Sequence, residues 1–434
     1  MGQKNIIIYF SDQQRWDTVN NYLTPNLMEL AAEGVKFNNN FTCQPVCGPA
    51  RACLQSGMYA TQCGSYFNGI PLSNSVKSLA DYFNEAGYQT AYIGKWHLAS
   101  DRIGGIHCEK SAIPKDRLGG YRYFRGADVL EFTSHGYDGY IFDENGNRID
   151  FKGYRADCIN DFALEFLEKR DKEKPFFMFV SQLEPHHQND ARRYEGYLPT
   201  VEKYRDYPIP EDLSSFKGDY DEMYADYLSA INRLDFNVGR LIKKLKAMDV
   251  YDDTVIIYTS DHGSHFKTRN AEYKRSCHEA SIHTPLIIKG DSFAGGKEVY
   301  AITSLIDLPP TVLSLAGIDI PDNYAGNNLA DNPDRECVFI QISEASGSRA
   351  IRTKRYKYSV RDAFFSAYIH HSSCVYFEDY LYDLENDINE TNNLINNKAY
   401  AKTRRELKAL LLSEMKNAGE KAPIILPAII KRNK

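Results

Sequence analysis

The sequence contains no apolar run near the about 20 residues that a helix needs to cross a bilayer. It also lacks an excess of basic residues, because 52 Lys and Arg stand against 58 Asp and Glu, a formal charge of −6. We therefore expect neither nucleic acid nor a membrane as a partner. The amino-terminal stretch MGQKNIIIYFSDQQ has a short apolar run that is followed at once by charge, which is too short and too polar for a secretory signal. We therefore expect a cytoplasmic protein.

Cysteine is scarce and scattered, with nine residues in 434 and no C-x-x-C pair. Disulfide frameworks belong to small secreted domains, and structural zinc sites need closely spaced Cys and His pairs. Both are disfavoured here, and we expect mostly reduced thiols. A cysteine that matters in this chain should do so through its own chemistry.

The sequence does contain a regular alternation of short apolar runs with amphipathic segments. Buried strands are predicted at 5–10, 88–94, 175–182, 253–260 and 284–290, and helices at 24–34, 75–87, 157–169, 219–248 and 305–317. This alternation predicts an α/β fold with a large, mostly parallel sheet flanked by helices.

The pattern changes after about residue 330. Short strand-like runs at close spacing, followed by a helical segment, predict a small C-terminal antiparallel sheet plus helix. We therefore expect a large domain over 1–330 and a smaller α+β subdomain over 331–434. The segment 120–156 is rich in Tyr and Gly and poorly periodic, so we expect an elaborated loop region there.

Two predicted strands end in polar pairs. Asp12 and Gln13 follow the first strand, and Asp261 and His262 follow the strand at 253–260. Ligands of open α/β sheets bind beyond the carboxyl ends of the strands. Carboxylate, amide and imidazole groups together suit a hard divalent cation. Either pair alone is more commonly a turn or a helix cap, and it is the occurrence of both that favours a metal site.

The segment CGPAR (47–51) places a cysteine where a helix is predicted to start. Pro49 suits the first turn of a helix and Gly48 its cap, which would leave Cys47 just ahead of the amino end, with Arg51 nearby. Such a position attracts anions. A buried structural cysteine beside a surface arginine would explain this string alone equally well.

Positive side chains also follow predicted strands. They are Lys95 and His97 in GKWHL, His186 and His187 in LEPHHQ, and Lys274. A single Lys or His in a loop is usually solvated surface. Together, these residues would suit a pocket for a doubly charged or strongly polarised anion.

Taken in order, these motifs resemble the formylglycine-dependent sulfatases of the alkaline-phosphatase superfamily, in particular bacterial carbohydrate sulfatases. CGPARACLQSG resembles the family signature C-x-P-[SA]-R followed by L-x-[TS]-G, and SDQ, GKWHL, the P-H pair, TSDHG, Lys274 and LYDLENDINETNNL (381–394) follow in the family's order. The sequence departs from the family at four positions: Gln13 for Asp, His262 for Asn, His283 for Arg and Ile388 for Pro. The first two suggest a subgroup with altered metal ligation.

The resemblance implies that Cys47 is oxidised after translation to Cα-formylglycine by a maturation enzyme that reads the C-x-P-x-R context. The hydrated aldehyde would attack sulfur with one hydroxyl, and its second hydroxyl would let sulfate leave by C–O cleavage. One divalent cation would be bound, with Ca²⁺ preferred and Mg²⁺ or Mn²⁺ as alternatives. Its implied ligands are Asp12, Gln13, residue 47, Asp261 and His262.

The resemblance also implies roles for the other residues. Arg51 would hold the diol and the sulfate oxygens, and Lys95 and Lys274 would neutralise the sulfuryl group. His186 would protonate or hydrogen-bond the leaving oxygen, and His97 would take the proton of the second hydroxyl. His187 is left as a supporting or substrate-contact residue.

The expected substrate is a small sulfated sugar, desulfated at a chain end or as a free monosaccharide. The 31 tyrosines, and the aromatic 120–156 segment with His135 and Asp138, suit a carbohydrate pocket, although ordinary packing would explain the tyrosines equally well. An aryl sulfate is the competing substrate. The oligomeric state stays open.

Three other functions compete with this one. A phosphonate monoester or phosphodiester hydrolase of the same superfamily is disfavoured because Lys95 favours a sulfate site. A non-catalytic sulfated-glycan-binding protein would lack one of the site residues. An unmodified cysteine enzyme would use the Cys47 thiolate, and no motif beyond these same residues supports it.

Overall fold

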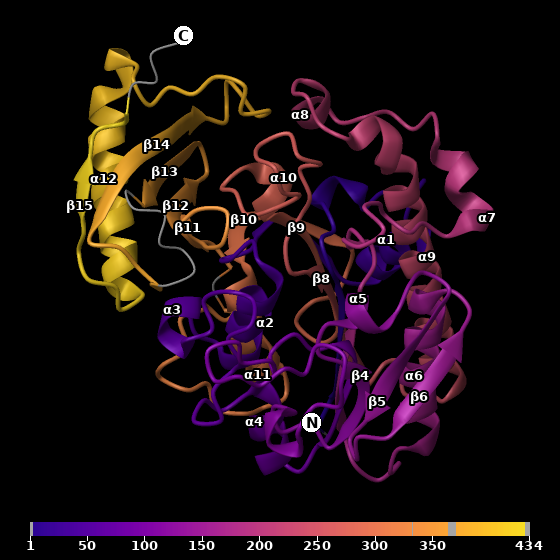
Figure 1. Cartoon of the computed structure of the whole chain (residues 1–434). Coiled ribbons are helices and arrows are strands. Elements are labelled where there is room, and N and C mark those ends of the chain that lie inside the picture. Colours follow the sequence, from indigo (N-terminus) through magenta and orange to yellow (C-terminus); the bar gives the residue numbers. More distant parts are fainter. Residues whose placement is uncertain (1–2, 332, 363–369, 430–434) are drawn as a thin grey trace.

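The computed structural model describes residues 3–331, 333–362 and 370–429. A ten-stranded sheet runs through the larger part of the molecule in the order β10-β2-β9-β8-β1-β7-β3-β4-β5-β6 (Figure 1). Its strands are β1 Asn5–Ser11, β2 Val35–Phe41, β3 Gln89–Lys95, β4 Tyr123–Ala127, β5 Asp138–Asp143, β6 Arg148–Lys152, β7 Phe176–Ser181, β8 Thr254–Ser260, β9 His283–Lys289 and β10 Lys297–Ser304.

The centre of this sheet is parallel and its flanks are mixed. Strands β8, β1, β7, β3 and β4 pair in parallel, whereas β9 runs antiparallel to both β8 and β2, and β5 and β6 add antiparallel pairs. The predicted α/β fold with flanking helices is confirmed. Four of the five predicted buried runs form the parallel strands β1, β3, β7 and β8, whereas the fifth, 284–290, forms the antiparallel strand β9.

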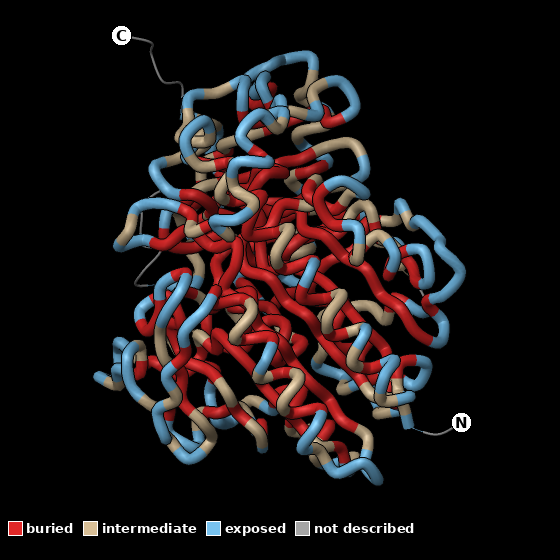
Figure 2. The backbone as a smooth tube through the Cα atoms, turned by 90° about the vertical axis from the view of Figure 1, so that its right-hand side faces the viewer, coloured by how far each residue is buried: buried red, intermediate tan, exposed pale blue. Residues whose placement is uncertain are grey.

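Strand β1 shows why these runs lie at the centre. Its residues from Ile6 to Phe10 are completely buried. Ile6, Ile8 and Phe10 join the apolar cluster on one face of the sheet, and Ile7 and Tyr9 join the cluster on the other. A strand covered on both faces must be apolar at consecutive positions. Figure 2 shows these buried strands crossing the middle of the molecule.

Helices cover both faces of the sheet. Helices α1, α6 and α9 contribute to the cluster on one face, and α2, α4 and α11 to the cluster on the other. The helices are α1 Pro25–Glu33, α2 Cys47–Ser56, α3 Ala60–Cys63, α4 Leu79–Glu85, α5 Leu130–Thr133, α6 Arg155–Lys169, α7 Leu198–Val201, α8 Glu211–Ser214, α9 Tyr220–Ala247, α10 Glu279–Ile282, α11 Leu308–Leu315 and α12 Ala401–Asn417.

Two expectations about local structure were wrong. The predicted helix 75–87 begins only at Leu79, because Ser78 caps it and exchanges hydrogen bonds with Asp81 in a capping box. The segment 120–156 is not a loop region, since it contains β4, α5 and the β5–β6 hairpin that extends the sheet at one end.

The C-terminal part forms a second sheet, as predicted. Strands β11 Cys337–Ile342, β12 Ser348–Thr353, β13 Tyr356–Asp362 and β14 Val375–Asp383 pair antiparallel, and β15 Ile424–Leu426 adds a short parallel edge. Helix α12 packs against this sheet through its buried face (Figure 1). The division at residue 330 stays a prediction, and the two parts share apolar packing.

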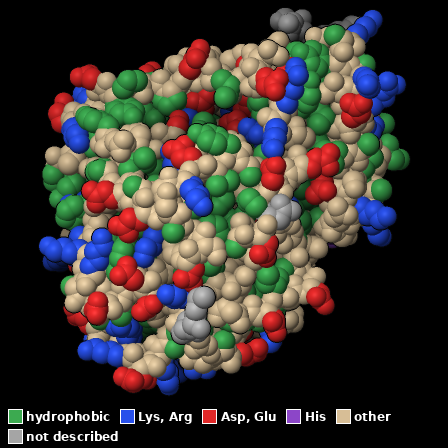
Figure 3. Space-filling view, turned by 180° about the vertical axis from the view of Figure 1, so that it is seen from behind, with side chains coloured by type: hydrophobic (Ala, Val, Ile, Leu, Met, Phe, Trp, Pro, Cys, Tyr) green, Lys and Arg blue, Asp and Glu red, His purple; other side chains and the backbone are tan. Residues whose placement is uncertain are grey.

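None of the helices in the described residues is long and apolar enough to cross a membrane. Over the face seen in Figure 3, lysine and arginine side chains are interspersed with aspartate and glutamate.

Candidate active site

Helix α2 begins at Cys47, two residues earlier than predicted. Val46, in extended conformation, is its N-cap, so Gly48 and Pro49 lie within the first turn and not ahead of it. Pro49 is tolerated there because its missing N–H has no partner in a first turn. The Gly48 N–H donates to Asn68 Oδ1 at 2.9 Å. All ten residues of α2 are buried, Arg51 included, so Arg51 is not a surface arginine.

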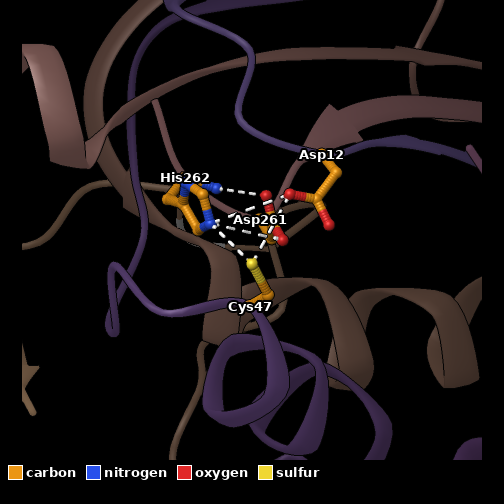
Figure 4. A group of neighbouring side chains, drawn as sticks. All are labelled: Asp12, Cys47, Asp261 and His262. Carbon is orange, nitrogen blue, oxygen red and sulfur yellow. Dashed lines mark hydrogen bonds and ion pairs between the residues drawn. The ribbon is translucent and has the colours of Figure 1, made fainter. Parts of the chain in front are cut away.

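Four side chains converge in front of this helix (Figure 4). Asp12, Cys47, Asp261 and His262 each bring one ligand atom into a group whose members lie within 4.8 Å of one another. Cys47 Sγ lies 3.2 Å from His262 Nε2 and 3.5 Å from Asp12 Oδ1. The two polar pairs meet because β1 and β8 are parallel neighbours, with Ser11 beside Ser260.

The group has the donors of a cation site. Asp261 Oδ1 accepts from the backbone N–H groups of Gln13 and His262, at 3.0 and 2.8 Å, while its Oδ2 is buried without a hydrogen-bond partner in the described residues. His262 Nδ1 lies 3.0 Å from Gly263 O, and donation to that carbonyl leaves Nε2 as an acceptor facing Cys47. The side chains present therefore fit a divalent cation.

The electrostatics of the two aspartates point the same way. Burial and the neighbouring Asp12 carboxylate raise the pKa of Asp261 to about 7. A divalent cation between the two carboxylates would remove this like-charge repulsion.

Gln13 lies beside this group. Its side-chain nitrogen donates to Tyr194 Oη at 2.8 Å and to Ser264 Oγ at 3.2 Å. Because both bonds use the side-chain nitrogen, the side-chain carbonyl oxygen of Gln13 is the atom that could bind a cation. Neither Tyr194 nor Ser264 belongs to a motif that the sequence analysis identified.

Three cations surround the other side of Cys47. Lys95 Nζ and Arg51 Nη2 both contact Asp12 Oδ2, at 2.7 and 2.8 Å, and Lys274 Nζ lies 2.8 Å from Cys47 Sγ. Burial alone would raise the pKa of the Cys47 thiol, but the charges of Lys274 and Lys95 outweigh it and lower that pKa well below its ordinary value. The position of Cys47 Sγ thus stabilises negative charge.

His186 bridges the cations to a carboxylate that the sequence did not indicate. Its Nε2 lies 3.0 Å from Lys274 Nζ and its Nδ1 lies 3.0 Å from Glu131 Oε2. Glu131 is buried on α5 and also accepts from Asn189 Nδ2 at 2.9 Å. Burial and the charge of Lys274 lower the pKa of His186, so its ring is neutral in the free protein.

These groups open into a cavity of about 420 Å³, a size typical of small-molecule sites. Cys47, Lys95, His97, His186, His187 and Lys274 all line it. His97 Nδ1 is buried without a hydrogen-bond partner in the described residues, and the His187 ring stacks on Tyr273 at 4.0 Å. Every predicted catalytic residue except Arg51, which lies behind Asp12, therefore faces one cavity.

The segment 120–156 lines two neighbouring cavities with different residues. Val129, Glu131 and Phe132 line the main cavity, whereas His135 and Asp138 line a neighbouring cavity of about 660 Å³. The expectation of an aromatic sugar-binding surface formed by this segment stays a prediction.

The model of the sulfatase family matches residues 4–318, and that of the C-terminal region of N-sulphoglucosamine sulphohydrolase matches residues 271–417. This chain belongs to the sulfatase family. The recognition made from its motifs is confirmed, and the protein is a sulfuric ester hydrolase.

Individual relatives of this sulfatase include enzymes named for carbohydrates. It is 31% identical to an ulvan-active sulfatase of Formosa agariphila, over 82% of this chain and 72% of the relative. It is 27% identical to an N-acetylglucosamine-6-O-sulfatase of Bacteroides thetaiotaomicron, over 96% of this chain and 87% of the relative. A structure solved in complex with its substrate D-glucosamine-2-N,6-O-disulfate matches with a TM-score of 0.81 at 24% identity, over 97% of this chain and 99% of that one.

Proposed function

We propose that this sulfatase removes sulfate from a small sulfated carbohydrate, at a chain end or as a free monosaccharide. The observation that carries the proposal is the position of Cys47, between an acidic cluster and three buried cations at one cavity of about 420 Å³. The named activities of the carbohydrate sulfatases among its relatives support the substrate class.

Cys47 is the precursor of the nucleophile in this proposal, converted to Cα-formylglycine by a maturation enzyme. Its Sγ marks where an oxygen of the converted side chain would lie. Asp12, Gln13, Asp261 and His262 would hold the cation, for which we prefer Ca²⁺ over Mg²⁺ or Mn²⁺ because oxygen ligands predominate. When bound, the cation would supply positive charge that lowers the pKa of a hydroxyl group at residue 47.

The surrounding cations would bind the sulfuryl group. Lys274 lies 2.8 Å from Cys47 Sγ, and Lys95 lies 2.7 Å from Asp12, so both ammonium groups are fixed before substrate arrives. Preorganised charge of this kind stabilises a transition state without reorganisation during the reaction. Arg51 is held by Asp12, Ser181 and the Lys95 carbonyl, and would hold the converted side chain and the sulfate oxygens.

His186 is the proposed proton donor to the leaving sugar oxygen. An anionic sulfate in the cavity favours the protonated ring, and Glu131 Oε2, 3.0 Å from Nδ1, would pair with that ring once it is protonated and hold its orientation. His97, on the same cavity, would take the proton that the second hydroxyl of residue 47 gives up.

The substrate class is tested by comparing kcat/KM for sulfated monosaccharides, sulfated oligosaccharides and 4-nitrophenyl sulfate. Binding energy from a recognised sugar is expected to appear in kcat/KM, so at least one small sugar should exceed the aryl ester. The proposal fails if the aryl ester is cleaved better than every sugar, or if long polymers are preferred and cut internally.

Glu131→Gln tests the proposed orientation of His186. We expect kcat on a sulfated sugar to fall roughly 10-fold with little change in KM, because a poorly oriented acid protonates the leaving oxygen less well. Hydrolysis of 4-nitrophenyl sulfate should change much less, since nitrophenolate leaves without a proton. The matched control is Glu109→Gln, because Glu109 is another glutamate that lines the same cavity. An equal loss on both esters would contradict the role given to Glu131.

A further inference from the structure

We propose that Arg102 binds a second anionic group, a sulfate or a carboxylate, on the sugar whose sulfate ester is cleaved. The inference rests on the proposed function and specifies its substrate further: a sugar with two negative charges. It assigns a further site on the wall of the cavity that Cys47 also lines.

Among the described residues, Arg102 is the cationic side chain of the cavity that has no partner. Lys95 is paired with Asp12, Lys274 contacts Cys47, and Arg275 is paired with both Glu272 and Glu344. Arg102 also lines the cavity, yet within residues 3–331, 333–362 and 370–429 its guanidinium makes no hydrogen bond or ion pair. A ligand anion would therefore displace no existing ion pair when it binds there.

The backbone that carries Arg102 is held in place. Arg102 N donates to Gly69 O at 2.9 Å, and the turn that follows is closed by the bridge between Asp101 and Ile106. Gly104 N also donates to Asp101 Oδ1 at 2.7 Å. The Cα of Arg102 is therefore held in place, while its exposed side chain leaves the guanidinium in water.

Gly69 links this turn to the start of α2. Its φ is +92°, and a Cβ at this position would come within 2.6 Å of Arg102 Cδ, so the arginine stem lies where only a glycine leaves room. The preceding residue, Asn68, accepts the hydrogen bond of Gly48 N at the first turn of α2. One backbone hydrogen bond, from Arg102 to Gly69, and one to the Asn68 side chain, from Gly48, thus connect Arg102 to the helix that carries Cys47.

Three of the four glutamates on the cavity wall already have partners, so they do not compete with an anion for Arg102. Of the four glutamates that line the cavity, Glu131 pairs with His186, and Glu272 and Glu344 pair with Arg275. Glu109 lies 3.7 Å from His107. A guanidinium presents a planar fork that matches two oxygens of a sulfate or carboxylate at once, which an ammonium does not.

The test compares kcat/KM for glucosamine 6-O-sulfate, for the same sugar with a second sulfate on its nitrogen, and for a sulfated disaccharide that carries a uronic acid. The unaltered protein is expected to prefer at least one doubly charged substrate by roughly 10-fold, the size of a charged hydrogen bond in partly open surroundings. Arg102→Gln should remove that preference, and Arg102→Lys should keep only part of it. If the preference is for the N-sulfated sugar, Arg102 binds a sulfate. If it is for the disaccharide with the uronic acid, Arg102 binds a carboxylate.

Arg122→Gln is the matched control, because Arg122 is also exposed but does not line the cavity. It should leave the preference unchanged. The proposal is overturned if Arg102→Gln retains the preference, or if the unaltered protein shows none.

A binding measurement separates this inference from the proposed function. Calorimetry of the same three sugars with Cys47→Ala, with and without Arg102→Gln, reports recognition without turnover. If no sugar is hydrolysed but the doubly charged sugar binds about 10-fold tighter only when Arg102 is present, the proposed function fails and the anion site stands. Equal affinities in both backgrounds overturn the anion site.

Discussion

Cys47→Ala is expected to abolish sulfate release, lowering kcat by on the order of 10⁴-fold or more, as removal of a nucleophile does in other hydrolases. The side chain lies where Asp12, Asp261 and His262 meet the ammonium group of Lys274. Cys47→Ser should be nearly inactive in multiple turnover and should accumulate a sulfated serine, because serine has a single hydroxyl and no route to expel sulfate. Full activity in Cys47→Ala would contradict the assignment.

The conversion of Cys47 can be measured directly by mass spectrometry. The peptide that contains residue 47 should be about 18 Da lighter than its thiol form in active protein, the difference between a thiol and an aldehyde side chain. Activity should scale with the converted fraction when preparations with different degrees of conversion are compared. Undiminished activity in fully unconverted protein would instead support a thiolate enzyme.

Asp261→Asn is expected to remove cation binding and to lower kcat/KM by roughly 10³-fold, because a neutral amide leaves the site one negative charge short. The carboxylate has one buried oxygen without a hydrogen-bond partner in the described residues, and burial beside Asp12 raises its pKa to about 7. The fold should tolerate the change, since it removes like-charge repulsion and keeps the side-chain volume.

Asp253→Asn is the control for this prediction. Asp253 directly precedes the amino end of β8, whereas Asp261 follows its carboxyl end, and its side chain is 72% exposed. Elemental analysis should find about one Ca²⁺, Mg²⁺ or Mn²⁺ per chain in the parent and in the control, and little in Asp261→Asn. Thermal unfolding with and without a chelator gives a readout independent of turnover. A parent protein that holds no stoichiometric cation and is indifferent to chelators would contradict the site.

Much of the candidate site follows from sequence because it lies where strands end. Asp12 and Asp261 come directly after two continuous apolar runs, and a run buried on both faces of a sheet indicates a central strand. The two strands, β1 and β8, are parallel neighbours. The side chains of Asp12 and Asp261 then meet at one edge of the sheet, whatever the loops do. Cys47 was placed near the correct helix end, two residues off, because proline allows several positions within a first turn.

The parts that the sequence did not indicate lack such a periodic signal. Strand β2 reads VKFNNNF, and its three asparagines conceal a strand whose neighbours β9 and β10 supply the pairing. Glu131 is a single glutamate in a segment of poor hydrophobic periodicity, and its contact with His186 depends on long-range packing. Arg102 is likewise one exposed arginine among many until the cavity is known.

The central claim is tested most directly by comparing a sulfate ester with a phosphonate ester on the same preparation. The measurement is kcat/KM for 4-nitrophenyl sulfate and for 4-nitrophenyl phenylphosphonate, with cation-loaded protein whose residue 47 is converted. The sulfuryl group offers three non-bridging oxygens to Lys95, Lys274 and the cation, whereas the phosphonate replaces one of them by a carbon that accepts no hydrogen bond. The account predicts that the sulfate ester is cleaved at least about 10-fold more efficiently. A preference for the phosphonate, or no release of sulfate from any ester, would contradict it.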